Sequence, residues 1–486
     1  MSLRERLGLG ANGGKGLPAV AQPLPDESPD GALKPEADGT TTLAMLTPQS
    51  VQQAAAEATP AVTKAYQQLK TRVHQQVLRR LDIDALDRLP PDRLRDELKL
   101  LVEQLLQEES IALNAVERRA LVTEIQDEML GLGPLEPLLQ DPSVSDILVN
   151  TCRQVYVERH GKLEMTNIAF SDNAHLMKII EKIVSRVGRR VDESSPMADA
   201  RLEDGSRVNV IIPPLAIDGP ILSIRRFAST PLQMSNLISY KSLSEEMALF
   251  MAAATEAEVN IVISGGTGSG KTTLLNILSS YIPATERIVT IEDAAELQLQ
   301  QPHVVRLETR PANVEGRGEI TQRALVRNAL RMRPDRIVLG ETRGPEALDM
   351  LQAMNTGHEG SMTTIHANTA RDALSRLESM IAMAGVDLPT RAARSQIASA
   401  IGLVIQTNRL TDGTRRITSI TEIAGMEGDV IMMQELFCFK QTGVLSDGTV
   451  QGYFSATGVR SRLWEKLVSK GIRLPEHLFD PVRQVV

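Results

Sequence analysis

Between positions 61 and 131, apolar residues recur every third or fourth residue, the spacing of helices that bury one face. The apolar positions expected to face one another are Val62, Leu69, Val73, Val77 and Leu81, then Leu94, Leu98, Leu101 and Leu105, then Val116, Leu121, Ile125 and Met129. Asn114 is suited to cap the third helix, and Gly131 and Gly133 to end it. We therefore predict a small helical bundle over residues 61–131, a pattern more typical of packing or docking than of chemistry.

After residue 131 the pattern changes to short strand-like runs interrupted by one helix. The segments DILVN, QVYVER and RVNVIIPP are typical of strands, and NAHLMKIIEKIVSRVG is typical of a helix. The last strand-like segment, ILSIRRF, is followed by ASTPLQMSNLIS, which is typical of a linker. This mixture predicts an α/β N-terminal domain over residues 132–228 and a linker over residues 229–242.

From residue 243 to about residue 425, strand-like and helix-like segments alternate repeatedly, which favours a mainly parallel α/β sheet. The remaining residues are β-rich and end in a helix that contains Trp464. We predict one α/β domain over residues 243–486 with a C-terminal β/α appendage.

The first 60 residues are rich in Ala, Pro, Gly, Gln, Thr and Asp, so we expect a disordered head there. The whole chain of 486 residues is 42% hydrophobic, which suits two to four domains with cores of their own. Its net charge of −8 lacks the basic footprint of duplex-binding proteins and argues against nucleic acid as the main partner.

The first residues carry no apolar segment typical of a signal peptide, and no run approaches the roughly 18 apolar residues that span a bilayer. Cys152 and Cys438 lie far apart and lack metal or disulfide spacing, which suits a reducing compartment. We expect a soluble cytoplasmic protein that associates with a membrane only through partners.

The segment GGTGSGKTT, residues 265–273, lies between an apolar strand and a helix, the context that a phosphate-binding loop requires. Glycines let the backbone turn and approach an anion closely, and the helix N-terminus favours negative charge. Lys271 is placed to reach the β- and γ-phosphates and Thr272 to bind Mg²⁺. The predicted nucleotide-binding residues of this loop are Gly266, Thr267, Gly268, Ser269, Gly270, Lys271, Thr272 and Thr273.

Acidic residues follow the next strand-like segments. RIVTIEDAAELQL places Glu292, Asp293 and Glu296 after one strand, and RIVLGETRG places Glu341 after another. A carboxylate at such a strand end can hold Mg²⁺ through water or orient an attacking water. Each acid alone is more often a solvated strand end, but their repetition after one phosphate loop favours a catalytic role.

The segment NTGHEGSMTTIHAN contributes His358 and His366, whose spacing does not fit zinc binding on one helix face. They are either hydrogen-bonding structural histidines or sensors of the γ-phosphate.

Arginines are concentrated, and Arg323, Arg327 and Arg331 recur every fourth residue on one predicted helix, with Arg333 and Arg336 after them. They form either a solvated face or a subunit interface from which an arginine reaches a neighbour's phosphates. The same alternatives apply to Arg207, Arg225 and Arg226.

Four stretches together, GGTGSGKTT, TIEDAAEL, LRMRPDRIVLGETRG and TGHEGSMTTIHAN, resemble the phosphate loop, acidic box, Gly-Glu signature and histidine box of the type II/type IV secretion ATPase superfamily. They occur in that family's order, and the resemblance extends over roughly residues 130–440. Within the superfamily the chain looks most like the CpaF-type motors of tight-adherence (Tad) pili.

This resemblance implies a homohexameric ring with a RecA-like C-terminal ATPase domain that uses ATP and Mg²⁺. Lys271 and Thr272 would hold phosphates and metal, Glu296 would polarise the attacking water, and Glu341 would support either the metal, through water, or the attacking water itself. The other residues implied near the nucleotide are Glu292 and Asp293 beside Glu296, His358 and His366 as sensors, and Arg207, Arg225, Arg226 and Arg333 closing on the γ-phosphate.

The implied partner is a platform protein of the bacterial inner membrane, on whose cytoplasmic face the motor would act. No zinc is expected, because the four-cysteine module of some relatives is absent. Two alternatives remain: an ATPase of a type IV secretion or DNA-uptake channel, and a nucleotide-gated scaffold with little turnover.

Overall fold

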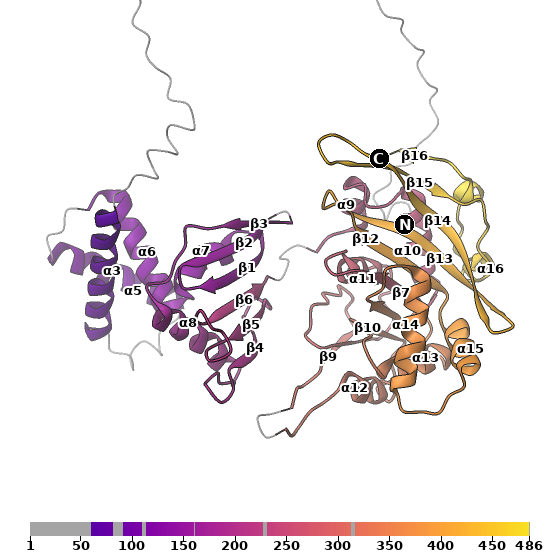
Figure 1. Ribbon diagram of the computed structural model, residues 1–486, viewed down its shortest axis with the longest axis horizontal. Helices are drawn as coiled ribbons and strands as arrows, with labels where there is room; N and C mark the ends of the chain where they lie inside the picture. Colours follow the sequence, from indigo (N-terminus) through magenta and orange to yellow (C-terminus); the bar gives the residue numbers. More distant parts are fainter. Residues whose placement is uncertain are drawn as a thin grey trace, which may run out of the picture. The chain divides into compact units, whose positions relative to one another are not determined.

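The computed structural model describes residues 60–80, 91–108, 113–159, 161–226, 231–312 and 316–485 (Figure 1). They form two compact units: one contains most of the residues up to Arg225, and the other contains the chain from Arg226 onward together with Glu203–Arg207. The head predicted as disordered lies outside the described residues, apart from Pro60.

The first unit begins with three helices, α3 (Pro60–Arg80), α5 (Pro91–Glu108) and α6 (Ala115–Leu130). Asn114 caps α6 as predicted, since its side chain accepts the N–H groups of Val116 and Glu117 while Glu117 reaches back to the Asn114 N–H. Val116 was expected in the core but is 75% exposed, because it lies in the first turn of α6. The buried residues of this bundle are Leu69, Val73, Val77, Leu98, Val102, Leu105, Leu106, Leu121, Val122 and Ile125.

The same unit continues through η1 (Gly133–Leu135) and α7 (Glu136–Gln140) into a six-stranded sheet in the order β3-β2-β1-β6-β5-β4. Its strands are β1 (Val144–Thr151), β2 (Gln154–Arg159), β3 (Lys162–Met165), β4 (Met197–Arg201), β5 (Arg207–Ile211) and β6 (Ile221–Arg225), and α8 (Asn173–Arg186) lies between β3 and β4 in the chain. Leu176, Ile180 and Ile183 of α8 share one hydrophobic cluster with Val149, Val157 and Ile224 of the strands. Burial of one face of α8 against the sheet therefore holds this domain together.

The second unit is built on a ten-stranded sheet in the order β16-β15-β14-β13-β12-β7-β11-β10-β8-β9. Its first six strands in the chain are β7 (Ile261–Gly265), β8 (Ile288–Glu292), β9 (Val304–Glu308), β10 (Arg336–Leu339), β11 (Met362–Ile365) and β12 (Leu403–Arg409), and neighbours among them pair in parallel. The strands β13 (Arg415–Glu427), β14 (Val430–Val444), β15 (Val450–Ala456) and β16 (Gln484–Val485) then pair antiparallel onto β12. The expected C-terminal appendage therefore extends the main sheet.

Helices cover both faces of this sheet, as expected from the central strands β7, β8, β10 and β11, in which every residue is buried. On one face α10 (Glu245–Glu256) and α11 (Lys271–Ser279) pack on Ile261, Ile263 and Ile405. On the other face α12 (Gln322–Ala329), α13 (Glu346–Asn355), α14 (Ala370–Met383) and α15 (Thr390–Ala400) pack on Val262 and Val404 (Figure 1). This is the RecA-like α/β arrangement expected from the sequence, and it fixes where each strand ends.

Part of the segment predicted as a linker is folded. Helix α9 (Met234–Ser239) lies within residues 229–242, and Met234 is buried in the same hydrophobic cluster as α10. Its apolar residues Leu237 and Ile238 pack there as well, which the polar composition of the segment concealed. The end of the chain adds α16 (Trp464–Ser469) and η2 (Glu476–Phe479), where Trp464 packs edge-on to Phe479.

None of the helices in the described ranges is long and apolar enough to cross a membrane.

Candidate nucleotide-binding site

The phosphate loop connects the end of β7 to the start of α11. Gly268 and Gly270 have φ angles of +68° and +97°, which glycine adopts without strain, and Gly270 caps α11. Gly265 has no room for a side chain, because an added Cβ would lie 2.4 Å from the carbonyl oxygen of Thr407 on β12. Because α11 begins directly after Gly270, its first backbone N–H groups lie at the phosphate loop, an arrangement that suits an anion.

Lys271, the first residue of α11, is only 7% exposed, and its ammonium group lies inside the loop. Its Nζ donates to the carbonyl oxygen of Gly266 at 2.9 Å and lies 3.2 Å from Nε2 of His366. Burial lowers the pKa of Lys271, Glu341 opposes this shift, and Arg343 adds to it. A negatively charged phosphate in the loop would compensate this buried charge.

Side chains from the ends of neighbouring strands meet beside Lys271. Since β7, β11, β10 and β8 are parallel neighbours in that order, their carboxyl ends lie at one edge of the sheet. His366 follows β11, and its Nε2 lies 3.3 Å from Oε1 of Glu341, which follows β10. The structure thus brings Lys271, His366 and Glu341, three of the residues predicted for the site, into contact with one another.

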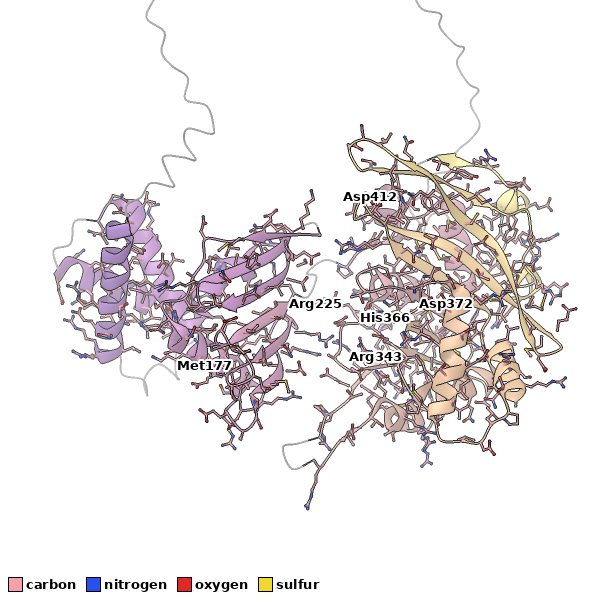
Figure 2. The ribbon with its side chains drawn as sticks, in the orientation of Figure 1. Met177, Arg225, Arg343, His366, Asp372 and Asp412 are labelled. Atoms are coloured by element: carbon pink, nitrogen blue, oxygen red, sulfur yellow. The ribbon has the colours of Figure 1, made fainter. Side chains whose placement is uncertain are left out.

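Arg343 was not singled out from the sequence, yet it joins two of the acids in this cluster (Figure 2). Its Nη2 donates to Oε2 of Glu341 at 2.7 Å, and its Nη1 lies 3.5 Å from Oδ2 of Asp293, which follows β8. The segment GETRG contained this signal, because a residue two positions after Glu341 lies at the same strand end. Burial and the charge of Lys271 lower the pKa of His366, Glu341 opposes this shift, and Arg343 adds to it.

Glu292 has a different position from the other acids. It is 4% exposed, and its Oε1 accepts the backbone N–H groups of Glu296 and Leu297 at 2.8 and 3.0 Å. Gly340 makes room for it, since a Cβ there would lie 2.8 Å from Cγ of Glu292. Among the described residues its Oε2 is buried without a partner. Glu292 therefore positions the backbone of Glu296 and is not oriented as a free carboxylate.

The two predicted histidine sensors lie at opposite edges of the sheet. His358 precedes β11, and its Nδ1 lies 2.9 Å from the carbonyl oxygen of Pro334, which precedes β10. Within one chain His358 therefore belongs to the amino edge, away from the phosphate loop at the carboxyl edge. Four strand residues between the histidines suffice for this separation, because a strand advances about 3.3 Å per residue.

Most predicted arginines are not brought to this edge within the unit. Arg333 also precedes β10, and it is exposed with a φ angle of +54°. Arg323 and Arg327 both donate to the buried carboxylate of Asp349, so they join α12 to α13. Arg336 is fully buried against Glu286, which excludes the solvated-face and interface interpretations for that residue.

The arginines of the six-stranded sheet belong to β5 and β6. Arg207 is the first residue of β5 and Arg225 the last residue of β6, followed by Arg226. Nε of Arg225 donates to Oδ1 of Asp146 on the neighbouring strand β1 at 3.2 Å.

The residues at the carboxyl edge fit a nucleotide with Mg²⁺. Thr272, the second residue of α11, is half-buried beside Lys271. In the described part of the chain no group of three or more His, Cys, Asp or Glu side chains is arranged to hold a metal ion. A magnesium ion here would be held by phosphate oxygens, water and Thr272, and Glu341 would support it through water, as is usual for Mg²⁺ beside nucleotides.

The environment of Glu292 predicts a pH-dependent stability. Burial raises the pKa of Glu292 from 4.5 to about 7, Glu296 adds to this, and the two backbone N–H groups and Arg306 oppose it. Because the folded-state pKa is the higher one, the stabilising contribution is complete below pH 4.5 and is lost as the pH rises through 7. Glu292→Gln keeps an acceptor but cannot ionise, so its melting temperature relative to wild type should rise from pH 5.5 to pH 8.5.

The size of this effect is on the order of 3 kcal/mol at most, or several degrees in a thermal melt. A suitable control is Glu427→Gln at an exposed position of β13, which should show no such trend. A constant difference between Glu292→Gln and wild type across this pH range would contradict a protonated, buried Glu292.

Comparison with protein families gives a match over most of the chain. The family described as type II/IV secretion system protein matches residues 128–447, and the N-terminal domain of type II secretion system protein E matches residues 66–130. The chain is 38% identical over 312 residues to a putative conjugal transfer protein of Mycobacterium tuberculosis, covering 63% of this chain and 88% of that protein.

Two further similarities concern conjugation and secretion proteins. Conjugal transfer protein TrbB of Rhizobium radiobacter is 35% identical over 309 residues, which is 63% of this chain and 91% of TrbB. The crystal structure of the VirB11 ATPase from the Brucella suis type IV secretion system, in complex with sulphate, is 31% identical, covers 60% of this chain and 95% of that one, and has a TM-score of 0.33. The matched span of residues 128–447 includes both the six-stranded sheet and the candidate nucleotide site. Because this match extends over more than half of the chain, the chain belongs to the type II/IV secretion system protein family.

Proposed function

We propose that this chain is an ATP-hydrolysing motor that drives a secretion or pilus machine from the cytoplasmic face of the bacterial inner membrane. The observation that carries the proposal is the cluster beside the phosphate loop, in which Lys271, His366, Glu341 and Arg343 are linked by contacts of 2.7 to 3.3 Å. These groups come from three neighbouring strand ends, so the fold positions them before any ligand binds.

In this proposal each residue has a defined task. The loop N–H groups and Lys271 bind the phosphates, and Lys271 exchanges its contact with the Gly266 carbonyl for the phosphate oxygens. Glu296, whose backbone Glu292 holds in place, orients the attacking water. Mg²⁺ bound to the nucleotide and Thr272 would neutralise charge that develops on the phosphate oxygens.

Glu341 and His366 connect hydrolysis to the rest of the domain. Glu341 contacts His366 through Oε1 and Arg343 through Oε2, so a change at either partner shifts its carboxylate. Nε2 of His366 lies 3.2 Å from Lys271 Nζ, and a γ-phosphate would compete with His366 for this ammonium group. We infer that the linked contacts of Lys271, His366 and Glu341 report whether the γ-phosphate is present.

The motor would act as a homohexameric ring, as the resemblance to secretion ATPases implies. Arg333 lies at the amino edge of its own sheet, so it can reach a γ-phosphate only on a neighbouring subunit. The arginines of the six-stranded sheet, Arg207, Arg225 and Arg226, are further candidates for closing on the nucleotide. An active site completed between subunits would tie hydrolysis to assembly of the ring.

For the machine itself we propose a Tad pilus motor that acts on an inner-membrane platform protein. The motif resemblance supports this, and so does the helical module over residues 66–130, which matches the N-terminal domain of a type II secretion protein. The second candidate is a type IV channel ATPase, which the similarity to conjugal transfer proteins and VirB11 supports at least as well. A scaffold with little turnover is less consistent with the acids gathered beside Lys271.

Two substitutions test the ATPase itself. Lys271→Ala should abolish nucleotide binding and turnover, since it removes the buried cation of the loop. Glu341→Gln should leave ATP binding within about threefold of wild type and slow turnover by about 10²-fold or more, the usual cost of a lost acid–base or charge-stabilising group. Binding is measured by calorimetry with MgATP, and turnover by phosphate release. Normal turnover in Glu341→Gln would remove Glu341 from the catalytic group.

A cellular experiment separates the two machines. The chromosomal gene is replaced by the Lys271→Ala allele, and surface pili and DNA transfer are both measured. The Tad proposal predicts loss of pili with unchanged DNA transfer. Loss of transfer with normal pili would assign the motor to a type IV channel instead.

A further inference from the structure

The tight turn between β12 and β13 lies against the phosphate loop on the side away from His366. Strand β12 pairs with β7 up to Thr407, opposite Gly265, and Oγ1 of Thr407 donates to Oγ of Ser269 at 2.8 Å. The Ser269 hydroxyl in turn donates to the Gly266 carbonyl oxygen at 2.9 Å, so Thr407 is connected to the loop by two successive hydrogen bonds. The end of β12 is therefore a wall of the nucleotide site, although it lies more than 130 residues later in the chain.

Arg415, the first residue of β13, makes direct contact with the loop. Its Nε donates to the carbonyl oxygen of Gly268 at 2.8 Å, and its Cδ lies 3.6 Å from where a Cβ on Gly270 would be. The peptide carbonyl and the N–H of the next residue point in opposite directions. By holding the Gly268 carbonyl, Arg415 also fixes the direction of the Ser269 N–H, which donates to the carbonyl oxygen of Gly266 at 3.4 Å.

The turn that presents Arg415 is itself held by one acid. Oδ1 of Asp412, which is labelled in Figure 2, accepts the N–H and hydroxyl of Thr414 at 2.9 and 2.6 Å. Its Oδ2 accepts the N–H of Val450 at 3.0 Å. The position of Arg415 is thus set by the C-terminal strands and not by the loop alone.

The next residue, Arg416, points to the other face of β13, as successive strand residues do. Arg416 is 6% exposed, and its Cζ lies 5.0 Å from the ring centroid of Phe439 on β14. Its Nη1 donates to the carbonyl oxygen of Lys241 at 2.8 Å. The N–H of Ile417 donates to the carbonyl of Ser242, also at 2.8 Å. These two carbonyls lie just after α9, in the segment through which the chain arrives from the six-stranded sheet.

We propose that Arg415 is a positioning residue for the phosphate loop, and that β13 links the loop to residues 241–242. Arg415 and Arg416 are adjacent on one strand, so a shift of the Gly268 carbonyl on nucleotide binding changes the start of β13 and with it the anchor of the interdomain segment. This inference rests on nucleotide binding in the proposed function, but it does not require hydrolysis. It gives the C-terminal extension of the sheet a role in transmitting the nucleotide state.

The test uses two substitutions that separate the hydrogen bond from the charge. The side-chain nitrogen of glutamine stands as many bonds from Cα as Nε of arginine, so Arg415→Gln keeps a donor to Gly268 and loses the charge. Arg415→Met has a side chain of the same length as glutamine, but it loses both the hydrogen-bond donor and the charge. Calorimetry on the full chain with MgADP and with the non-hydrolysed analogue AMP-PNP gives the dissociation constants.

We expect Arg415→Gln to bind within about twofold of wild type and Arg415→Met to bind about fivefold to tenfold more weakly, the effect of one hydrogen bond. Equal weakening of both variants would overturn the inference, because Arg415 would then act through its charge on the nucleotide. Unchanged binding in both would overturn it as well. Arg391→Met, which removes an exposed arginine paired with Asp429, is the matched control and should bind as wild type.

Hydrogen exchange tests the link to residues 241–242, first in the wild-type chain and then in Arg415→Met. In the wild-type chain AMP-PNP should slow exchange of the Ile417 amide, whose acceptor is Ser242, and in Arg415→Met at saturating nucleotide this slowing should be lost. The same slowing in both chains, or none in wild type, would contradict the link. A chain that binds AMP-PNP but does not hydrolyse ATP would refute the proposed function alone, and a chain that binds no nucleotide would refute both.

Discussion

The candidate site depends on the parallel pairing of β7, β11, β10 and β8, which brings four strand ends to one edge of the sheet. Each strand is short and buried on both faces, so helices on either side leave only the ends accessible. The phosphate loop, His366, Glu341 and Asp293 all follow these strands directly. None of them is near another in the sequence, and the sheet alone accounts for their meeting.

Burial at this edge acts on two groups of opposite charge in opposite directions. It lowers the pKa of Lys271 and raises that of Glu292 to about 7, because in both cases the charged form is the one that loses hydration. For Lys271 the bound phosphates would restore a favourable partner. For Glu292 the neutral form suffices, since its task is to accept two N–H groups of the Glu296 loop. Two side chains of one site thus have different roles that follow from their surroundings.

The local parts of this site could be predicted from the sequence. A strand, a glycine loop and a helix lie within a few residues of one another, so GGTGSGKTT and the acids after the next strands were identifiable from pattern, whereas a site role for His366 came from the resemblance to secretion ATPases. The positions of His358 and Arg333 were not, because the motif gives their order but not the edge of the sheet to which they belong. Arg415 was missed for another reason: its contact with Gly268 joins residues 147 positions apart through an antiparallel extension of the sheet. The buried side of α9 was hidden by the polar residues around Met234.

In the proposed function, a chain with this site hydrolyses ATP once neighbouring subunits complete the site. The most direct measurement is steady-state MgATP turnover per chain over a wide range of protein concentration, with the oligomer mass determined at each point. If the active site is completed between subunits, turnover per chain should rise steeply and then level off as rings assemble. Turnover that stays constant down to concentrations at which the chain is a monomer would contradict an active site shared between subunits, and no turnover in assembled rings would contradict the motor itself.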